Sequence, residues 1–314
     1  MNIGIIGVGA IGGWLAARLA LAGHQVTCVA RGETLAALSG GLVLRSTEGE
    51  KRASVRALNV APAEPQDLLI LATKAQALAE AAEAARPLVG TDTLILPLQN
   101  GVPWWFMPGE QLRSIDPDGR IEAALPFDQV IGTVVHASAR RVAPATVQLV
   151  HADKLLLGEP GGGTSERAER LCALFREAGV PAQPHDSIRQ AIWYKLWGNM
   201  TINPMSALTR ATADRLVGDE DLRSFILTAM AEAAAIGVEI GCPITESGEA
   251  RMEVTKRLGA FKTSMLQDLE AGRPLELEAL VGAPREIGRQ VGVCTPAIDA
   301  IYAMTRLLDE STRA

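Results

Sequence analysis

Residues 2–20 read NIGIIGVGAIGGWLAARLA, which joins a short apolar run to a glycine-rich turn and then to an alanine- and leucine-rich stretch. The glycines at 7, 9 and 12 form GxGxxG directly after an expected strand and at the start of an expected helix, which is the setting that the pattern requires. Gly7 permits a tight turn, Gly9 lets the backbone approach a pyrophosphate, and Gly12 lets the helix pack closely on the strand. The helix amides then point at the phosphates. The stretch predicts a dinucleotide site, and the alternative is a glycine-rich corner without a ligand. The predicted loop consists of Gly7, Val8, Gly9, Ala10, Ile11 and Gly12.

Strand and helix patterns alternate in the first part of the chain. Strands are expected over 3–6, 25–30, 68–73, 93–100 and 130–139, and helical stretches such as 10–23 and 75–89 lie between them. This alternation predicts a parallel sheet covered by helices on both faces. The runs over 41–60 and 130–157, broken by turns, predict antiparallel additions at the sheet edges.

Strand patterns stop after Asp186. Helical patterns follow over 187–208, 221–241, 253–272 and 277–293. The sequence therefore predicts two domains, an α/β Rossmann-type dinucleotide-binding domain over 1–186 and an all-α domain over 187–314.

Composition narrows the class of protein. The net charge of −6 provides no basic stripe and argues against a nucleic-acid binder. No apolar run approaches the roughly 18 residues of a membrane span. Cysteines occur singly, which is typical of reduced thiols, so a cytoplasmic protein is expected. The histidines are isolated and lack metal-ligand spacing, so no metal is expected. The single cysteines are Cys28, Cys172, Cys242 and Cys294, and the histidines are His24, His136, His151 and His185.

The end of the second strand indicates which dinucleotide is bound. NAD sites usually have an acid there, whereas this chain has Arg31 and no acid before Glu33. A guanidinium pairs with a 2′-phosphate, so NADP(H) is favoured. The alternative is that Arg31 is solvated and Glu33 binds the ribose. Lys74 ends the third strand, at the sheet edge where ligands of such sheets bind, although it could be an ordinary surface lysine.

Polar residues in two segments of the chain need an explanation. Asn100 precedes Gly101 after the next strand, so it either points into the cofactor cleft or only forms a turn. Lys195, Asn199 and Asn203 recur at a spacing of four residues and share a helix face. Asparagine is a poor helix former, so this stripe favours a cleft lining over a solvent-facing surface. Pro204 is expected to kink or end the helix.

A second polar group surrounds the Gly-Arg-Pro break at 272–274. It consists of Ser264, Gln267, Asp268, Glu276 and Glu278. Glu276 follows the break at the start of a helix, where the helix dipole alone would also favour a carboxylate.

Together these segments resemble the ketopantoate reductase family, the 2-dehydropantoate 2-reductases of the wider 6-phosphogluconate dehydrogenase-like group, over nearly the whole chain. The matching motifs are GxGxxG, Arg31, TKA at 73–75, QNG at 99–101, KLWGNMTINPMSALT at 195–209, TSMLQD at 263–268 and GRPLELE at 272–278. The resemblance implies NADPH-dependent reduction of 2-dehydropantoate to (R)-pantoate, a step toward pantothenate and coenzyme A. It also leads us to expect a homodimer.

The resemblance implies a role for each matching residue. Lys195 matches the catalytic lysine, and Glu276 matches the acid that binds substrate and helps to place that lysine. Asn199 and Asn203 match substrate-binding asparagines, and Ser264 matches the serine that meets the substrate carboxylate. Asn100 matches the asparagine near nicotinamide and substrate, whereas Arg31 and Lys74 match the basic residues around the 2′-phosphate.

Departures from the family pattern keep a second substrate open. Val281-Gly282 stands where many members have Asn-Gly, and Gln76 is one place earlier than the glutamine of some members. The segment around Trp104 and Trp105 is unusual and could shape the pocket for another 2-oxo acid, or else be a loop elaboration or an oligomer contact. A non-catalytic NADP(H) sensor is a third hypothesis, which the presence of Lys195 and Glu276 disfavours.

Overall fold

The computed structural model describes residues 1–313, which fold as two compact units. The first unit contains Met1–Gln99 and Asp118–Arg189, and the second contains Asn100–Pro117 and the chain from Gln190 onward. The segment Asn100–Pro117 therefore belongs to the second unit, whereas the sequence analysis placed it within a continuous first domain over 1–186. Apolar stacking and backbone hydrogen bonds to residues far along the chain hold it there, as described below.

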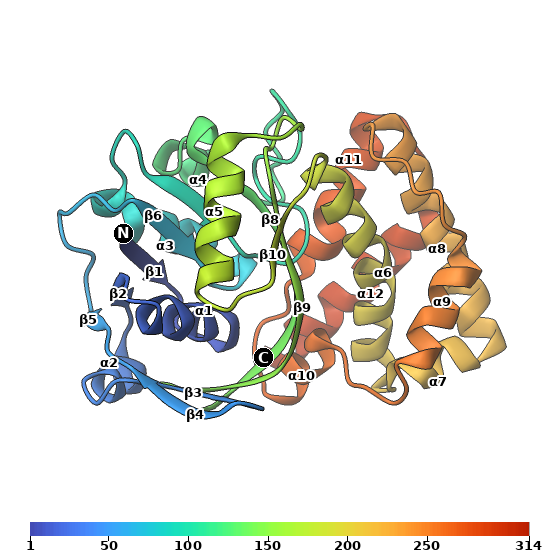
Figure 1. The fold of residues 1–314 in the computed structure, drawn as a ribbon. Helices are drawn as coiled ribbons and strands as arrows, with labels where there is room; N and C mark the ends of the chain where they lie inside the picture. The colour runs from blue at the N-terminus through green and yellow to red at the C-terminus, as the bar shows by residue number, and fades with distance from the viewer. Residues whose placement is uncertain (314) are drawn as a thin grey trace. The chain divides into compact units, whose positions relative to one another are not determined.

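A parallel five-stranded sheet forms the centre of the first unit, with the order β5-β2-β1-β6-β7 (Figure 1). Its strands are β1 (Asn2–Ile6), β2 (Gln25–Val29), β5 (Arg56–Leu58), β6 (Leu68–Leu71) and β7 (Leu94–Pro97). All five strands are parallel, and β2 and β5 lie on one side of β1 whereas β6 and β7 lie on the other. The carboxyl ends of β1 and β6 therefore form the switch point where doubly wound folds bind ligands.

A second sheet in the same unit corrects one expectation. Strands β10 (Ala182–Pro184), β9 (Thr146–Gly158), β3 (Leu42–Ser46) and β4 (Gly49–Ala53) follow one another, and β8 (Gly132–Ala143) pairs with β9. The runs over 41–60 and 130–157 were expected at the edges of the first sheet, but only β5 joins it, and in parallel. The remaining strands pair with one another because β8 and β9 form a long hairpin that supplies its own edges.

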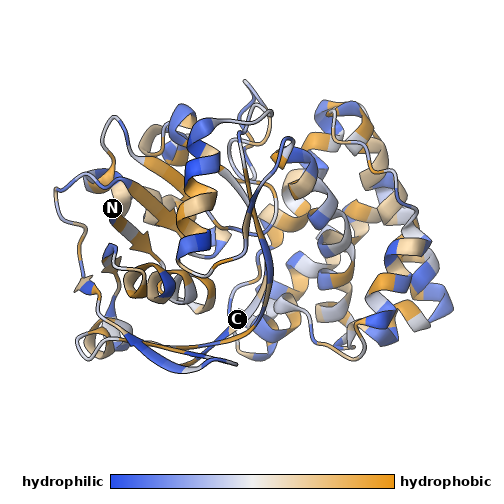
Figure 2. Cartoon of the chain, viewed as in Figure 1, coloured by the Kyte–Doolittle hydropathy of each residue, from blue (hydrophilic) through white to orange (hydrophobic). Residues whose placement is uncertain are grey.

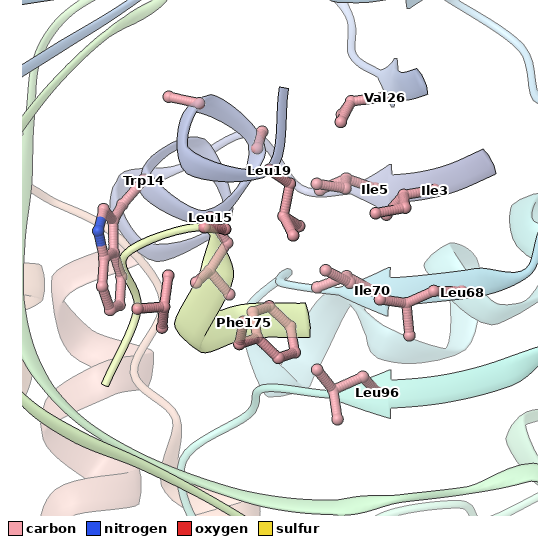
Figure 3. Packing of buried hydrophobic residues seen from close by; sticks show 14 of the residues in the cluster. Ile3, Ile5, Trp14, Leu15, Leu19, Val26, Leu68, Ile70, Leu96 and Phe175 are labelled. Atoms are coloured by element: carbon pink, nitrogen blue, oxygen red, sulfur yellow. The ribbon is translucent and has the colours of Figure 1, made fainter. Parts of the chain in front are cut away.

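Helix α1 (Ala10–Leu21) packs against strands of both sheets. A Cβ added to Gly13 would lie 2.6 Å from Val147 Cγ2 of β9, so the helix lies very close to the second sheet. Figure 3 shows Leu15 and Leu19 of α1 and Phe175 of α5 (Glu166–Glu177) facing the side chains of the central strands. These side chains are fully buried. The remaining helices of this unit are α2 (Gly32–Leu38), α3 (Leu78–Ala85) and α4 (Arg120–Ala124).

The second unit contains helices and no strands among its described residues, and its segment Asn100–Pro117 consists of turns and irregular backbone. Its helices are α6 (Ile188–Thr209), α7 (Ala213–Gly218), α8 (Glu220–Glu239), α9 (Gly248–Arg257), α10 (Ser264–Glu270), α11 (Ala283–Gln290) and α12 (Pro296–Arg313), and a π-helical turn spans Glu278–Gly282. The single helix expected over 253–272 is two helices, because Gly259 adopts a φ of +76° between them. In Figure 2, hydrophobic residues gather on the central strands and α1 of the first unit, while β4 is hydrophilic.

Helix α6 continues five residues beyond Pro204, so the proline does not end the helix, and of the two expectations the kink remains. Met205, Ser206 and Ala207 are buried after the proline. Their burial outweighs the hydrogen bond that the proline cannot donate.

Within residues 1–313, no helix is both long and apolar enough to cross a membrane.

Candidate active site

The glycine-rich loop has the geometry that its pattern predicts. Gly7 has a φ of +98°, and a Cβ there would lie 2.6 Å from the Ala72 carbonyl carbon of the neighbouring strand connection. A Cβ at Gly12 would lie 2.1 Å from the Gly7 carbonyl oxygen, so helix and strand approach too closely for any side chain. A Cβ at Gly9 would have no neighbour within 4 Å. Gly7 and Gly12 are therefore required by the fold, whereas nothing in the protein itself requires Gly9.

The amino end of α1 fits a phosphate group. Gly9 is its N-cap residue, no side chain caps the helix, and no acid lies in its first turn. Its first amides are therefore available to an anion, which the helix dipole also favours. Val8, Ala10 and Ile11 complete this loop between β1 and α1.

Two buried polar atoms lie at the same edge of the sheet. Thr73 Oγ1 follows β6 and Gln99 Oε1 follows β7, and neither has a hydrogen-bond partner within residues 1–313. The Gln99 amide nitrogen donates to the carbonyls of Leu71 and Thr73, which fixes the side chain. Buried polar atoms normally have partners, so these two atoms fit a bound ligand such as a dinucleotide. The sequence analysis quoted both residues within the motifs at 73–75 and 99–101 but assigned neither to the site.

The basic residues predicted for the cofactor are exposed at the ends of strands. Arg31 is the N-cap residue of α2, two residues after β2, and Lys74 lies three residues after β6. Glu33 is also exposed, in the first turn of α2. Since β2 and β6 both flank β1, the two cations lie at the carboxyl edge that carries the glycine loop.

In the second unit, Lys195 and Asn100 are in direct contact. Lys195 Nζ, on α6, donates a hydrogen bond to Asn100 Oδ1 over 2.8 Å. The helix that carries Lys195 is held firmly, because the indole nitrogens of Trp193 and Trp197 donate to carbonyls of α8.

The negative charge of Glu276 stabilises the ammonium of Lys195. Its side chain is 6% exposed and lies directly before the helix that begins at Leu277. Burial lowers the pKa of Lys195 to about 8, and the negative charge of Glu276 acts in the opposite direction. Lysine with a pKa close to neutrality suits proton transfer, because both of its forms are accessible near physiological pH.

The other residues predicted to bind the substrate are Asn199, Asn203 and Ser264, which lie on α6 and α10. Asn199 and Asn203 follow Lys195 at intervals of four on α6, and Asn203 is 8% exposed. Ser264 is the exposed first residue of α10, directly after the N-cap Thr263. Among the described residues, no hydrogen bond is recorded between the Ser264 side chain and Lys195, Asn100 or Glu276.

The unusual aromatic segment is part of the core. Trp104, Trp105 and Phe106 are 5%, 4% and 0% exposed. The Phe106 ring stacks on Trp193 with the centroids 5.9 Å apart. These three side chains therefore pack inside the chain itself. The indole nitrogens of Trp104 and Trp105 have no partner within residues 1–313.

Side chains within residues 1–313 form no group of three or more histidines, cysteines or acids that could hold a metal ion.

Comparison with known proteins places this geometry in a family. The model of the ketopantoate reductase PanE/ApbA matches residues 3–162, and that of its C-terminal domain matches residues 187–309. A 2-dehydropantoate 2-reductase from Mesorhizobium japonicum is 43% identical over 320 residues, which cover 98% of each chain.

Solved structures are also similar to this chain over nearly its full length. A protein from Ralstonia solanacearum with a solved crystal structure is 47% identical in sequence to this chain. The two structures superpose with a TM-score of 0.95 over 99% of this chain and 98% of that chain. The 2-dehydropantoate 2-reductase from Methylococcus capsulatus is 30% identical with a TM-score of 0.86, covering 100% and 98%. The chain is an NAD(P)-dependent oxidoreductase that belongs to the PanE/ApbA ketopantoate reductase family.

Proposed function

We propose that this enzyme uses NADPH to reduce 2-dehydropantoate to (R)-pantoate. The observation that carries the proposal is the contact between Lys195 and Asn100 in the presence of the buried Glu276. The relatives that match over nearly the full chain carry the name of this reaction, and the chain retains the three side chains that would perform it.

Lys195 acts on the carbonyl oxygen of the substrate. When bound, the nicotinamide supplies a hydride to C2, and negative charge develops on the C2 oxygen. The ammonium of Lys195 stabilises that charge by a hydrogen bond and donates its proton to the oxygen. Its lowered pKa, about 8, eases the release of this proton.

Glu276 and Asn100 prepare Lys195 for this step. The carboxylate of Glu276 favours the charged form of the lysine against the effect of burial. The carbonyl oxygen of Asn100 holds one of the three ammonium protons and so fixes the direction of the other two. Asn199, Asn203 and Ser264 bind the hydroxyl and carboxylate groups of the substrate, so that C2 faces the hydride donor.

NADPH is proposed over NADH because of the charges at the carboxyl edge of the central sheet. Arg31 and Lys74 bind the 2′-phosphate, while the amides at the start of α1 hold the pyrophosphate and Asn100 contacts the nicotinamide. A carboxylate at the position of Arg31 would repel the phosphate. Glu33 remains the residue that would bind an NADH ribose if the preference were reversed.

We further propose a cytoplasmic homodimer. Within residues 1–313, none of the four cysteines forms a disulfide, which suits a reducing compartment. The dimer rests on the family resemblance, and sedimentation of the purified protein tests it.

The direct test measures loss of NADPH absorbance with 2-dehydropantoate for the wild type and for Lys195→Ala. Rapid turnover that is lost in the variant, with NADPH binding retained, supports the reaction and the role of the lysine. Tight NADPH binding by the wild type without turnover of 2-dehydropantoate would disprove the proposed substrate.

A second 2-oxo acid substrate is the alternative, and one observation favours it. The two unpartnered indole N–H groups of Trp104 and Trp105 follow Asn100 closely in the chain and can donate to a ligand. A panel of 2-oxo acids with aliphatic and aromatic side chains, compared by kcat/KM, separates the two substrates.

A further inference from the structure

The helix after Glu276 begins with an irregular turn that releases one backbone carbonyl. Over Glu278–Gly282 the turn is π-helical, and the Ala283 N–H donates to the Glu278 carbonyl, five residues back. In an α-helix that N–H would bond to Ala279 instead. The next residue, Pro284, has no N–H to offer. The Ala279 carbonyl therefore has no donor within its own helix.

A distant segment uses this carbonyl. The Val102 N–H donates to Ala279 O over 2.8 Å. Gly101 makes the approach possible, because its φ is +97° and a Cβ there would lie 2.4 Å from the same oxygen. Asn100, the residue before this glycine, accepts the hydrogen bond of Lys195. One backbone hydrogen bond and one obligatory glycine thus connect the π turn to the residue that holds the lysine.

Side chains hold the π turn in shape. The Tyr302 hydroxyl donates to Glu278 Oε1 over 2.7 Å. Glu278 Oε2 lies over Gly282, where a Cβ would come within 2.2 Å of it. The Arg285 guanidinium covers the Tyr302 ring, 4.1 Å from its centroid, and Arg285 Nε pairs with Asp299 Oδ1 at 2.5 Å. Isolated π turns are rare, and they often lie at functional sites. The contacts around this turn therefore suggest that it has a functional role.

We propose that the π turn is a positioning device for catalysis, in which Tyr302 and Glu278 hold the Ala279 carbonyl in place, and this carbonyl fixes Asn100 against Lys195. The inference rests on the proposed role of Lys195 as proton donor. Tyr302, Glu278 and Pro284 are positioning residues, since they act through Asn100.

The first experiment compares Tyr302→Phe with Tyr194→Phe. Both tyrosines belong to the second unit and both donate to a glutamate, Tyr194 to Glu246, so each variant loses a comparable hydrogen bond. Tyr302→Phe is expected to lower kcat about tenfold with little change in KM for NADPH, because the lysine is misplaced while the groups proposed to hold the cofactor phosphates, at the start of α1 and at Arg31 and Lys74, are untouched. Tyr194→Phe is expected to leave kcat within about twofold of the wild type.

A double-mutant cycle separates positioning from general damage. In the Asn100→Ala background, Tyr302→Phe is expected to have no further effect on kcat, because the residue through which it acts is gone. Equal losses in the two backgrounds, or no loss in the single variant, would overturn the proposal.

A second variant, Pro284→Ala, restores an N–H at the position where the helix lacks one and leaves Tyr302 in place. It permits a regular α turn, in which Ala279 O takes its donor from Ala283 instead of Val102. The expected result is a loss of kcat of similar size with the thermal midpoint unchanged or raised. A kcat equal to that of the wild type would contradict the proposal.

An NMR titration that follows the ε-carbon of Lys195 measures the pKa of this lysine in the absence of turnover, and so tests its positioning independently of activity. Loss of the Asn100 acceptor removes a partner of the ammonium, so the pKa of Lys195 is expected to fall in Tyr302→Phe and to stay unchanged in Tyr194→Phe. Identical titrations would overturn the proposal. If the wild type fails to reduce 2-dehydropantoate, the proposed substrate is wrong, and the titration still decides whether the π turn positions the lysine.

Discussion

Lys195 donates to Asn100 across a separation of 95 residues in the chain, at 2.8 Å. The contact joins the middle of a long helix to the first residue of the segment Asn100–Pro117, which belongs to the same unit. An amide oxygen on an ammonium favours its charged form, as does the nearby charge of Glu276, and burial opposes both. The resulting pKa, about 8, is the property on which the proposed proton transfer depends.

The pH dependence of the reaction follows from this balance. A proton donor must be protonated, so kcat/KM is expected to fall about tenfold per pH unit above the pKa of Lys195, near pH 8. Glu276→Gln removes the charge that raises this pKa, so the alkaline limb is expected to move to lower pH and the maximal rate to fall. The pH–rate profile of each variant measures this. Glu253→Gln, on the exposed face of α9, serves as the control, and a limb that does not move with Glu276 would show that another group titrates.

The glycines of the first loop are expected to respond differently to alanine. Gly9→Ala meets no protein atom, so stability stays within about 0.5 kcal/mol of the wild type while NADPH affinity falls sharply. Gly12→Ala would place a methyl group 2.1 Å from a carbonyl oxygen, so the free energy of unfolding falls by about 1–3 kcal/mol or more. Urea titration and fluorescence titration with NADPH measure the two effects. Unchanged NADPH binding in Gly9→Ala would place the phosphates elsewhere.

Arg31→Ala is expected to reduce the preference for NADPH. Losing a charged hydrogen bond to a phosphate costs about 1.5–3 kcal/mol, so KM for NADPH should rise about 10- to 100-fold while KM for NADH changes little. Arg170→Ala is the matched control, since this exposed arginine is paired with Glu166 on α5 of the same unit. A parallel rise for both cofactors would mean that Arg31 contacts another part of the nucleotide.

Glu286 ties down the far end of the segment that begins at Asn100. Its two carboxylate oxygens accept the backbone N–H groups of Arg113 and Ser114, each over 2.8 Å. Glu286→Ala leaves both donors without a partner and is expected to lower the free energy of unfolding by about 1–3 kcal/mol. Glu286→Gln keeps one acceptor oxygen and should lose less. Amide hydrogen exchange at positions 113 and 114 provides the direct measurement, and slow exchange in the alanine variant would disprove the anchoring role.

Local patterns in the sequence were sufficient for the parts of the fold that depend on neighbouring residues. The GxGxxG loop, the parallel sheet and the polar stripe of α6 each follow from spacing over a few residues. The family resemblance added the roles of Asn100 and Glu276, for which local spacing allowed a turn or a helix-dipole explanation. The structure brings both residues to Lys195.

The pairing of strands that lie far apart in the chain could not be predicted from the sequence. Strands β3, β4, β8 and β9 carry ordinary strand patterns, but nothing in those patterns states which strand each will pair with. The same limit applies to the π turn, which lies next to a proline without an N–H and bonds to a backbone amide in a distant segment. Helices α7 and α12 were not among the expected helices, and the break at Gly259 was not anticipated either.

The interleaving of the two units has a consequence for how the gene can be cut. The chain passes between them three times, after Gln99, after Pro117 and after Arg189. A fragment that starts at Gln190 retains the lysine and the glutamate but lacks the asparagine, the phenylalanine that stacks on Trp193 and the amides that bind Glu286. Neither half is therefore a separable module, and recombination between relatives at the boundary near residue 186 would pair a lysine from one parent with an asparagine from the other.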